Sequence, residues 1–146
     1  MKQYNFYGWE NGFIKPKCAD IPYISNLWDI YDLLSGIWSA ETCPPRMRHK
    51  WTSDNPSLGQ CSITAFLVQD IFGGDVYGIL RSDGNYHCYN VIEGYIFDLT
   101  SEQFGDEILN YNNNPMQSRE IHFKKEEKHK RYELLKKRLL EVVKSK

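Results

Sequence analysis

The sequence predicts an α+β fold, in which a helix that carries a cysteine packs against an antiparallel β-meander. Three observations favour it: two stretches with apolar residues at helical spacing, then three short runs rich in Val, Ile, Tyr and Phe, and finally a charged helix with an apolar stripe. The 146 residues fit one domain covering 1–146. No internal repeat or flexible linker divides the chain.

The first predicted helix follows an N-terminal stretch of 24 residues that glycines and prolines interrupt. Ser25 is a suitable N-cap, and the helix should run to about Trp38. Its buried face is marked by apolar residues at helical spacing, which are Leu27, Ile30, Tyr31 and Leu34.

A long loop is expected from Glu41 to Gln60, because three prolines and a glycine interrupt this polar stretch. Loops of this length are uncommon in a compact domain and are often functional. We therefore treat it as a candidate wall or lid of a site.

The second predicted helix is CSITAFLVQDIF, residues 61–72, which begins after Gly59 and stops at Gly73-Gly74. Its apolar residues spread over most of its circumference, so we expect it to be central and buried on most sides. Cys61 lies in its first turn.

Three strands should follow, as DVYGILRS (75–82), NYHCYNVI (85–92) and YIFDL (95–99), separated by Asp-Gly and Glu-Gly turns. A short extended piece at Ile121–Phe123 is expected to add an edge strand. The last helix starts near Lys124, and its predicted apolar stripe consists of Tyr132, Leu135, Leu139 and Val142.

Composition limits the classes of protein that this chain can belong to. No apolar run approaches the roughly 20 residues of a membrane span, and the first residues lack the apolar stretch of a signal peptide, so we expect a cytoplasmic protein without a membrane partner. In a reducing cytosol the four cysteines, Cys18, Cys43, Cys61 and Cys88, should be free thiols.

Neither a metal nor a cofactor is expected. His49, His122 and His129 have no metal-ligand spacing to one another or to the cysteines, and the glycine pair lacks the rest of a phosphate or dinucleotide motif.

The charge is uneven along the chain, although the net value is −1. From Lys124 onward there are ten Lys or Arg against four Glu. Basic residues on an amphipathic helix usually form its solvated face, so we expect no nucleic-acid partner.

The Glu93-Gly94 turn allows the register of the last hairpin to be worked out. A two-residue turn pairs Ile92 with Tyr95 and, further along, Tyr89 with Asp98. Since directly paired residues share a face and side chains alternate along a strand, His87 and Asp98 should be diagonal neighbours on one face. Diagonal positions lie roughly 7 to 8 Å apart at the backbone, within reach of an imidazole–carboxylate hydrogen bond.

Cys61, His87 and Asp98 therefore form a candidate catalytic triad. A cysteine at a helix N-terminus meets the positive end of the helix dipole and unpaired amides, which favour the thiolate and can hold an oxyanion. His87 would serve as base and acid, and Asp98 would orient it. Trp51 and Gln60 flank the cysteine and are candidate substrate-binding residues, with Gln60 a possible oxyanion donor. Structural roles are open as well. Cys61 could serve as packing at a helix start, His87 as a strand histidine bonded to a tyrosine hydroxyl, and Asp98 as a cap for the segment that begins at Thr100. Trp51 and Gln60 could be buried structural residues.

The segments GQCSITAFLVQDIFGG, YHCYN and FDLTSEQF, together with WSAET and WTSDNPSLGQC, resemble the YunG-like family of small bacterial proteins. The resemblance runs from about Trp38 to Phe104. More distantly, the order of Cys helix, His strand and Asp-Leu-Thr strand is similar to the transglutaminase-like and papain-like cysteine enzymes. That similarity implies a papain/transglutaminase-like core, with Cys61 as nucleophile, His87 as base and acid, and Asp98 as the orienting residue.

Two functions are therefore expected from the sequence. The first is a cysteine-dependent acyl-transfer enzyme, such as an amide hydrolase, a deamidase or a transglutaminase-like enzyme, acting on a peptide, an amide or a small molecule. The alternative is a catalytically silent binding or regulatory domain on the same scaffold. The sequence leaves the substrate, the acyl acceptor and the oligomeric state open.

Overall fold

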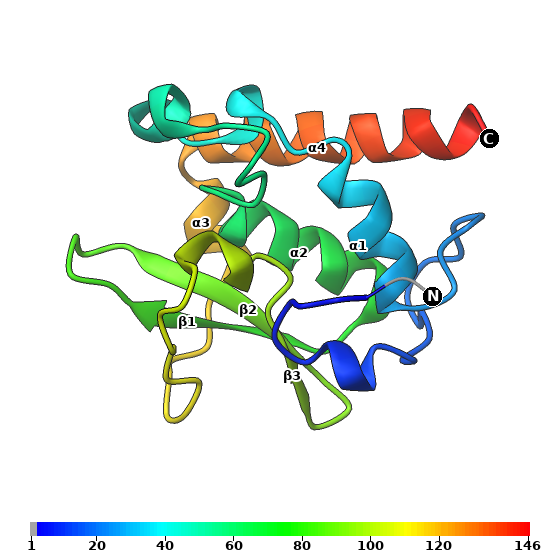
Figure 1. The fold of residues 1–146 in the computed structure, drawn as a ribbon, viewed down its shortest axis with the longest axis horizontal. Helices are drawn as coiled ribbons and strands as arrows, with labels where there is room; N and C mark the ends of the chain where they lie inside the picture. Colours follow the sequence, from blue (N-terminus) through cyan, green and yellow to red (C-terminus); the bar gives the residue numbers. More distant parts are fainter. Residues whose placement is uncertain (1–2) are drawn as a thin grey trace.

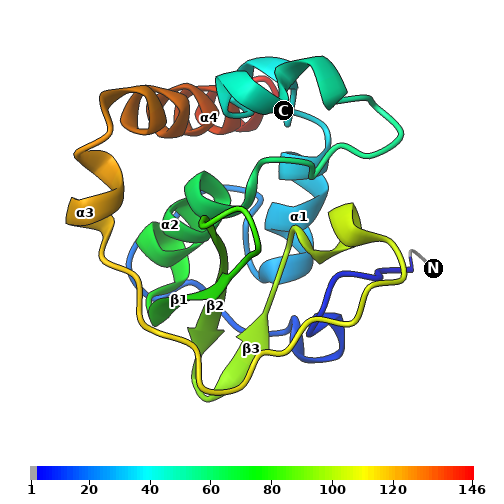
Figure 2. The ribbon, with the colours of Figure 1, turned by 90° about the vertical axis from the view of Figure 1, so that its left-hand side faces the viewer.

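The computed structural model describes residues 3–146, and its helices and small sheet confirm the predicted α+β class. Figure 1 shows α4 at the top, α2 with α1 beside it in the middle, and the sheet below, and Figure 2 shows the same order from the side. The α-helices are α1 (Leu27–Ser35), α2 (Cys61–Phe72), α3 (Arg119–Phe123) and α4 (Glu126–Lys144). The strands are β1 (Asp75–Leu80), β2 (Tyr86–Ile92) and β3 (Tyr95–Phe97). Short 3-10 helices are η1 (Trp9–Asn11), η2 (Ala40–Thr42), η3 (Pro45–Lys50) and η4 (Ser101–Phe104).

Helix α1 is shorter than the predicted helix, and Ser25 is not its cap. Asn26 is the N-cap, with its side chain accepting from the Asp29 amide at 2.9 Å. The Ser25 amide instead donates to the Asp29 carboxylate. The helix ends at Ser35, one residue before Gly36.

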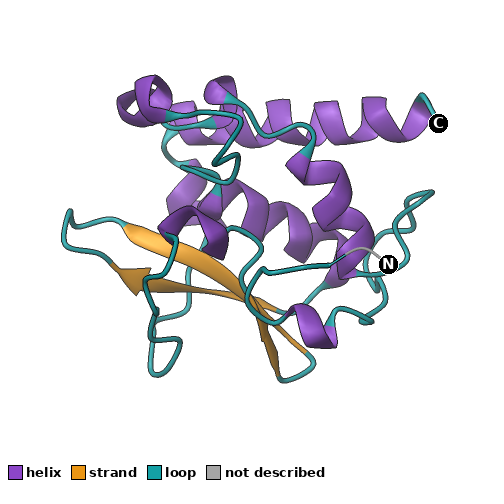
Figure 3. Ribbon diagram, viewed as in Figure 1, coloured by secondary structure: helices purple, strands orange, loops and turns teal. Residues whose placement is uncertain are grey.

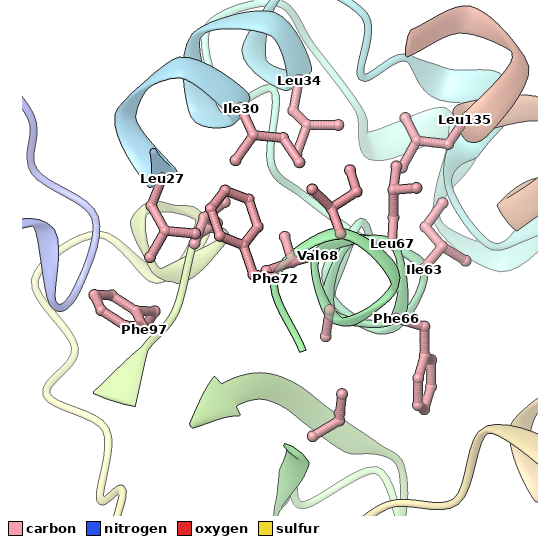
Figure 4. Close-up of a cluster of buried hydrophobic side chains, with 14 of the residues drawn as sticks. Leu27, Ile30, Leu34, Ile63, Phe66, Leu67, Val68, Phe72, Phe97 and Leu135 are labelled. Atoms are coloured by element: carbon pink, nitrogen blue, oxygen red, sulfur yellow. The ribbon is translucent and has the colours of Figure 1, made fainter. Parts of the chain in front are cut away.

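Helix α2 has the predicted bounds and is the central element of the core. Nine of its twelve residues are buried. Figure 4 looks along its axis and shows its side chains directed towards α1, towards Leu135 of α4 and towards the sheet side. A helix that is apolar all round is stable only when it is buried on most sides, so α2 gives the chain a rigid platform.

The three strands form the predicted antiparallel meander in the order β1-β2-β3, and Figure 3 shows the α-helices gathered on one side of it. The predicted register holds for Ile92–Tyr95, Val91–Ile96 and Asn90–Phe97. The ladder then stops, because Asp98 pairs with Tyr7 of the N-terminal segment and not with Tyr89.

The predicted edge strand at Ile121–Phe123 is wrong. These residues belong to α3, whose N-cap Ser118 accepts a hydrogen bond from the Ile121 amide, and a local cap of this kind favours a helix. The chain does run along the outer edge of β1, but earlier. The Gly78 amide donates to the Pro115 carbonyl at 3.0 Å, and the Gln117 amide donates to the Val76 carbonyl at 2.8 Å.

Helix α4 uses a slightly different stripe from the predicted one. Tyr132, Leu135 and Leu139 are buried as expected, and the next buried residue is Val143, with Val142 only partly covered. Spacings of four residues keep Leu135, Leu139 and Val143 on one side of a helix.

Candidate functional site

Cys61 is the first residue of α2, and a tight turn places it there. Gly59, two residues earlier, has φ of +75°, and a Cβ built on it would lie 3.0 Å from Pro44 Cδ and 3.1 Å from Cys43 Sγ. The position therefore requires glycine for both conformation and space. The thiol of Cys61 is partly exposed, whereas Cys43 and Cys88 are buried and Cys18 is exposed.

The Cys61 thiol lies at the edge of β2 beyond the end of the short strand β3. Strand β3 pairs with β2 only from Asn90 to Ile92, so the other end of β2 has no strand partner on that side. The sulfur of Cys61 lies 3.9 Å from the Tyr86 carbonyl there, and the Cys88 amide hydrogen-bonds to it. The Cys88 side chain lies in the hydrophobic core, on the opposite face of the strand from His87, because side chains alternate along a strand.

His87 and Asp98 meet as predicted, although the pairing of Asp98 with Tyr89 that the prediction used does not form. His87 Nε2 lies 2.6 Å from Asp98 Oδ2, and the two side chains are only 2% and 1% exposed. Nδ1 of His87 is buried and makes no hydrogen bond of standard geometry within the described residues. Because Asp98 holds Nε2, Nδ1 is the ring nitrogen left for Cys61.

The two groups shift each other's pKa. Burial alone would lower the pKa of His87, but the charge and hydrogen bond of Asp98, together with Cys61, raise it to about 10. Burial alone would raise the pKa of the Cys61 thiol, but His87 and the Cys88 amide outweigh burial and lower it. Both shifts favour the ion pair of a thiolate and an imidazolium over the neutral pair.

Asp98 has further donors that the sequence did not reveal. Tyr111 donates its hydroxyl to Asp98 Oδ2 at 2.7 Å, and the Thr100 amide and hydroxyl lie 3.3 and 3.4 Å from Oδ1. The Thr100 contact has a recognisable local signal, because Asp side chains commonly accept from the amide two residues on. Tyr111 has none, since it arrives from the Asn-rich segment thirteen residues later.

An aromatic ring covers His87, and an ion pair packs on that ring. The Phe104 ring packs edge-on against the imidazole at 4.7 Å between centroids. The Arg81 guanidinium lies 4.6 Å from the Phe104 centroid and binds Glu107 with two bonds of 2.8 and 2.9 Å. These contacts keep water from His87 and hold the ring in one orientation.

The predicted loop from Glu41 to Gln60 contains the end of η2 and all of η3, and its last part is fixed against η4. Ser57 donates its hydroxyl to the Thr100 carbonyl at 3.4 Å, and the Gly59 amide donates to Gln103 Oε1 at 3.2 Å. These bonds tie the turn before Cys61 to the turn after Asp98. The loop is therefore a wall that sets the distance between two members of the candidate triad.

Gln60 does not have the place expected of a substrate-binding residue or an oxyanion donor. Its side chain is fully buried, and its amide nitrogen lies 3.1 Å from the Ser39 carbonyl and 3.2 Å from the Leu58 carbonyl. The amide nitrogen thus stabilises the loop. Trp51 is partly exposed and donates its indole N–H to the Pro56 carbonyl at 3.0 Å, so the structure gives it a role in the loop while leaving part of its ring accessible.

The first amides of α2 are the available oxyanion donors. The Gln60 side chain does not cap this helix, which leaves its first N–H groups without a side-chain acceptor. They lie beside Cys61, where charge would develop on a bound carbonyl. Across residues 3–146, no three or more His, Cys, Asp or Glu side chains come together in a way that could hold a metal ion.

Comparison with known proteins places this site in a family. The family model described as YunG protein matches residues 26–144. The chain belongs to the YunG family. The YunG match extends the resemblance seen in the sequence at both ends, and it includes all three candidate triad residues.

One YunG relative comes from Bacillus subtilis (strain 168) and is described as an uncharacterised protein. It is 51% identical over 55 residues, or 38% of this chain and 47% of that protein, so the match spans about half the length of the relative. No solved structure matches the chain. None of the helices in residues 3–146 is both long and apolar enough to cross a membrane.

Proposed function

We propose that this protein is a cysteine-dependent acyl-transfer enzyme that acts on an amide through a Cys61–His87–Asp98 triad. Its core would be papain/transglutaminase-like, with the nucleophile at the start of a central helix and the His and Asp on an antiparallel sheet. The main support is the buried 2.6 Å bond between His87 Nε2 and Asp98, which leaves Nδ1 for the thiol of Cys61. A histidine used only for packing does not need an ionised partner in the core.

The geometry suits a two-step reaction. The Cys61 thiolate attacks the amide carbonyl carbon, and the first amides of α2 stabilise the negative charge that develops on oxygen. As the C–N bond breaks, His87 Nδ1 gives its proton to the leaving nitrogen, which departs as an amine or ammonia. The product at this stage is a Cys61 thioester and a neutral His87.

The second step resolves the thioester. Water or an amine loses a proton to His87 Nδ1 while it attacks the thioester carbonyl, and the C–S bond breaks to restore the thiolate. Asp98 keeps the ring in one orientation and stabilises its positive charge in both steps. Water as acceptor gives hydrolysis or deamidation, and an amine gives a new amide.

Alkylation by iodoacetamide tests the activated thiol, and Cys18 is a built-in reference because it is the exposed cysteine. At pH 6 an ordinary thiol with a pKa near 8.5 is about 0.3% thiolate. A fully ionised Cys61 has several hundred times more thiolate, and the lower intrinsic nucleophilicity of a thiolate with a lowered pKa offsets only part of this factor. We therefore expect Cys61 to react at least about fivefold faster than Cys18 at pH 6, as measured by peptide mass spectrometry.

Acyl transfer is tested with an activated ester and the matched variants Cys61→Ala and Cys18→Ala. Wild type and Cys18→Ala should release a burst of alcohol product and carry a thioester that hydroxylamine removes, whereas Cys61→Ala should do neither. If Cys61 reacts with iodoacetamide at pH 6 no faster than Cys18, the proposal fails and a silent binding domain is the better description.

A further inference from the structure

The start of α4 carries a cation that the triad does not use. Lys128 is in the first turn of α4, and its Nζ lies 2.8 Å from His122 Nδ1. His122 is buried, and its Nε2 lies 2.8 Å from Gln117 Oε1. Figure 1 shows α3 and the start of α4 on the side of the molecule where α2 begins, and α4 packs against α2. The ring of His122 also packs against Phe66 of α2 at 5.2 Å.

The hydrogen bonds show which group donates and which accepts among Lys128, His122 and Gln117. Burial and the charges of Lys128 and Lys125 lower the pKa of His122 to about 4, so its ring is neutral near pH 7. A neutral ring that donates from Nε2 to Gln117 must accept at Nδ1. Lys128 is therefore the donor, and it uses one of its three N–H groups on His122 while keeping its charge.

Lys128 has no anionic partner. Within the part of the chain that the structure describes, no carboxylate lies within salt-bridge distance of its Nζ, although the side chain is partly buried. Burial lowers its pKa. Gln117, the other partner of His122, lies against Gly78 of β1. Gly78 pairs with Cys88, whose amide hydrogen-bonds to the Cys61 sulfur, so this group of side chains lies close to the thiol. A desolvated cation without a counter-ion attracts one.

We propose that Lys128, held by His122, forms a subsite for a carboxylate of the substrate next to Cys61. The subsite gives the proposed acyl-transfer function, on which it rests, a substrate class: amides that carry a carboxylate close to the scissile carbonyl. One ammonium group with a neutral histidine matches a singly charged anion better than a phosphate dianion. The two free N–H groups of Lys128 would donate to the carboxylate oxygens.

Iodoacetate and iodoacetamide test this subsite, because the two reagents have similar size and differ in charge. The ratio of their rates at Cys61 should be about three- to tenfold higher in wild type than in Lys128→Gln. Lys130→Gln is the matched control, since Lys130 lies on the same helix, is exposed and pairs with Glu126. It should keep the wild-type ratio. The charge of His87 favours iodoacetate in all three proteins, so the difference between variants reports Lys128.

Working at pH 8 separates this proposal from the proposed function, because even an ordinary thiol is alkylated there. An unchanged ratio in Lys128→Gln overturns the subsite, whatever the speed of iodoacetamide. A Lys128-dependent ratio supports the subsite even if Cys61 is no more reactive than Cys18. The wild-type ratio should also fall with added salt more steeply at Cys61 than at Cys18, a measurement that needs no variant to fold.

Discussion

Removing the thiol in Cys61→Ala should change how the stability of the protein depends on pH. In the native state the pKa of Cys61 is lowered, while in the unfolded chain it has its ordinary value near 9.0. A native thiolate means that the unfolded state binds one more proton at this residue wherever the pH lies below 9. Stability from Cys61 is therefore fully present above that value and is lost as the pH falls towards the native pKa.

The slope follows from proton linkage. One proton of difference changes the free energy of unfolding by about 1.4 kcal/mol per pH unit, so the advantage of wild type over Cys61→Ala should grow with pH, by up to about 2.7 kcal/mol from pH 6 to pH 8. His87 stays protonated in the variant, because the charge and hydrogen bond of Asp98 raise the pKa of His87 more than Cys61 does.

In wild type alone the opposite shifts nearly cancel between about pH 6.5 and 9. The raised pKa of His87 contributes stability that is fully present below 6.5 and is lost as the pH rises to about 10. Over that range the native thiolate and imidazolium together hold as many protons as the unfolded thiol and neutral imidazole. The contribution of the thiolate to stability is therefore seen only when wild type is compared with Cys61→Ala. The lowered pKa of His122 acts equally in both proteins and drops out of the difference.

Urea denaturation followed by tryptophan fluorescence, with a reductant present, measures both free energies at each pH. Ultraviolet absorbance of the thiolate, taken as wild type minus Cys61→Ala, gives a second readout on the same samples. A free-energy difference that stays constant from pH 6 to pH 8 would refute this account of the Cys61–His87 pair.

Three further predictions concern the surroundings of the pair. Asp98→Asn removes the charge that keeps His87 protonated, so alkylation of Cys61 at pH 6 should slow at least about fivefold, and an unchanged rate would contradict the role of Asp98. Tyr111→Phe removes a donor to the same carboxylate and should lower the free energy of unfolding by about 1–3 kcal/mol in urea denaturation. Gly59→Ala should lower the free energy of unfolding more than Gly84→Ala, because both glycines have positive φ but an added Cβ meets neighbouring atoms at Gly59 and none at Gly84. We expect a loss of roughly 1–3 kcal/mol for Gly59→Ala and about 1 kcal/mol for Gly84→Ala. Equal losses would show that crowding at Gly59 is absent.

Local chain geometry explains what the sequence determined by itself. The bounds of α2 follow from glycines on both sides, and the register of β2 and β3 follows from the two-residue turn at Glu93 and Gly94, both with positive φ. Since side chains alternate along a strand, continuing that register predicted that His87 and Asp98 share a face. Their contact forms even though the ladder ends at Phe97 and Asp98 pairs with Tyr7. Each rule acts over a few residues, and the residues themselves display it.

Only the tertiary structure decided how distant segments meet around the site. Tyr111 reaches Asp98 because a long loop passes beneath the sheet, and Phe104 covers His87 because η4 folds back on β2. Gln60 stands directly before the cysteine, yet packing with the loop turns its amide away from the thiol. Lys128 lies in α4, 67 positions after Cys61 in the sequence. Such contacts depend on how whole elements pack in three dimensions, and no local pattern of residues encodes them.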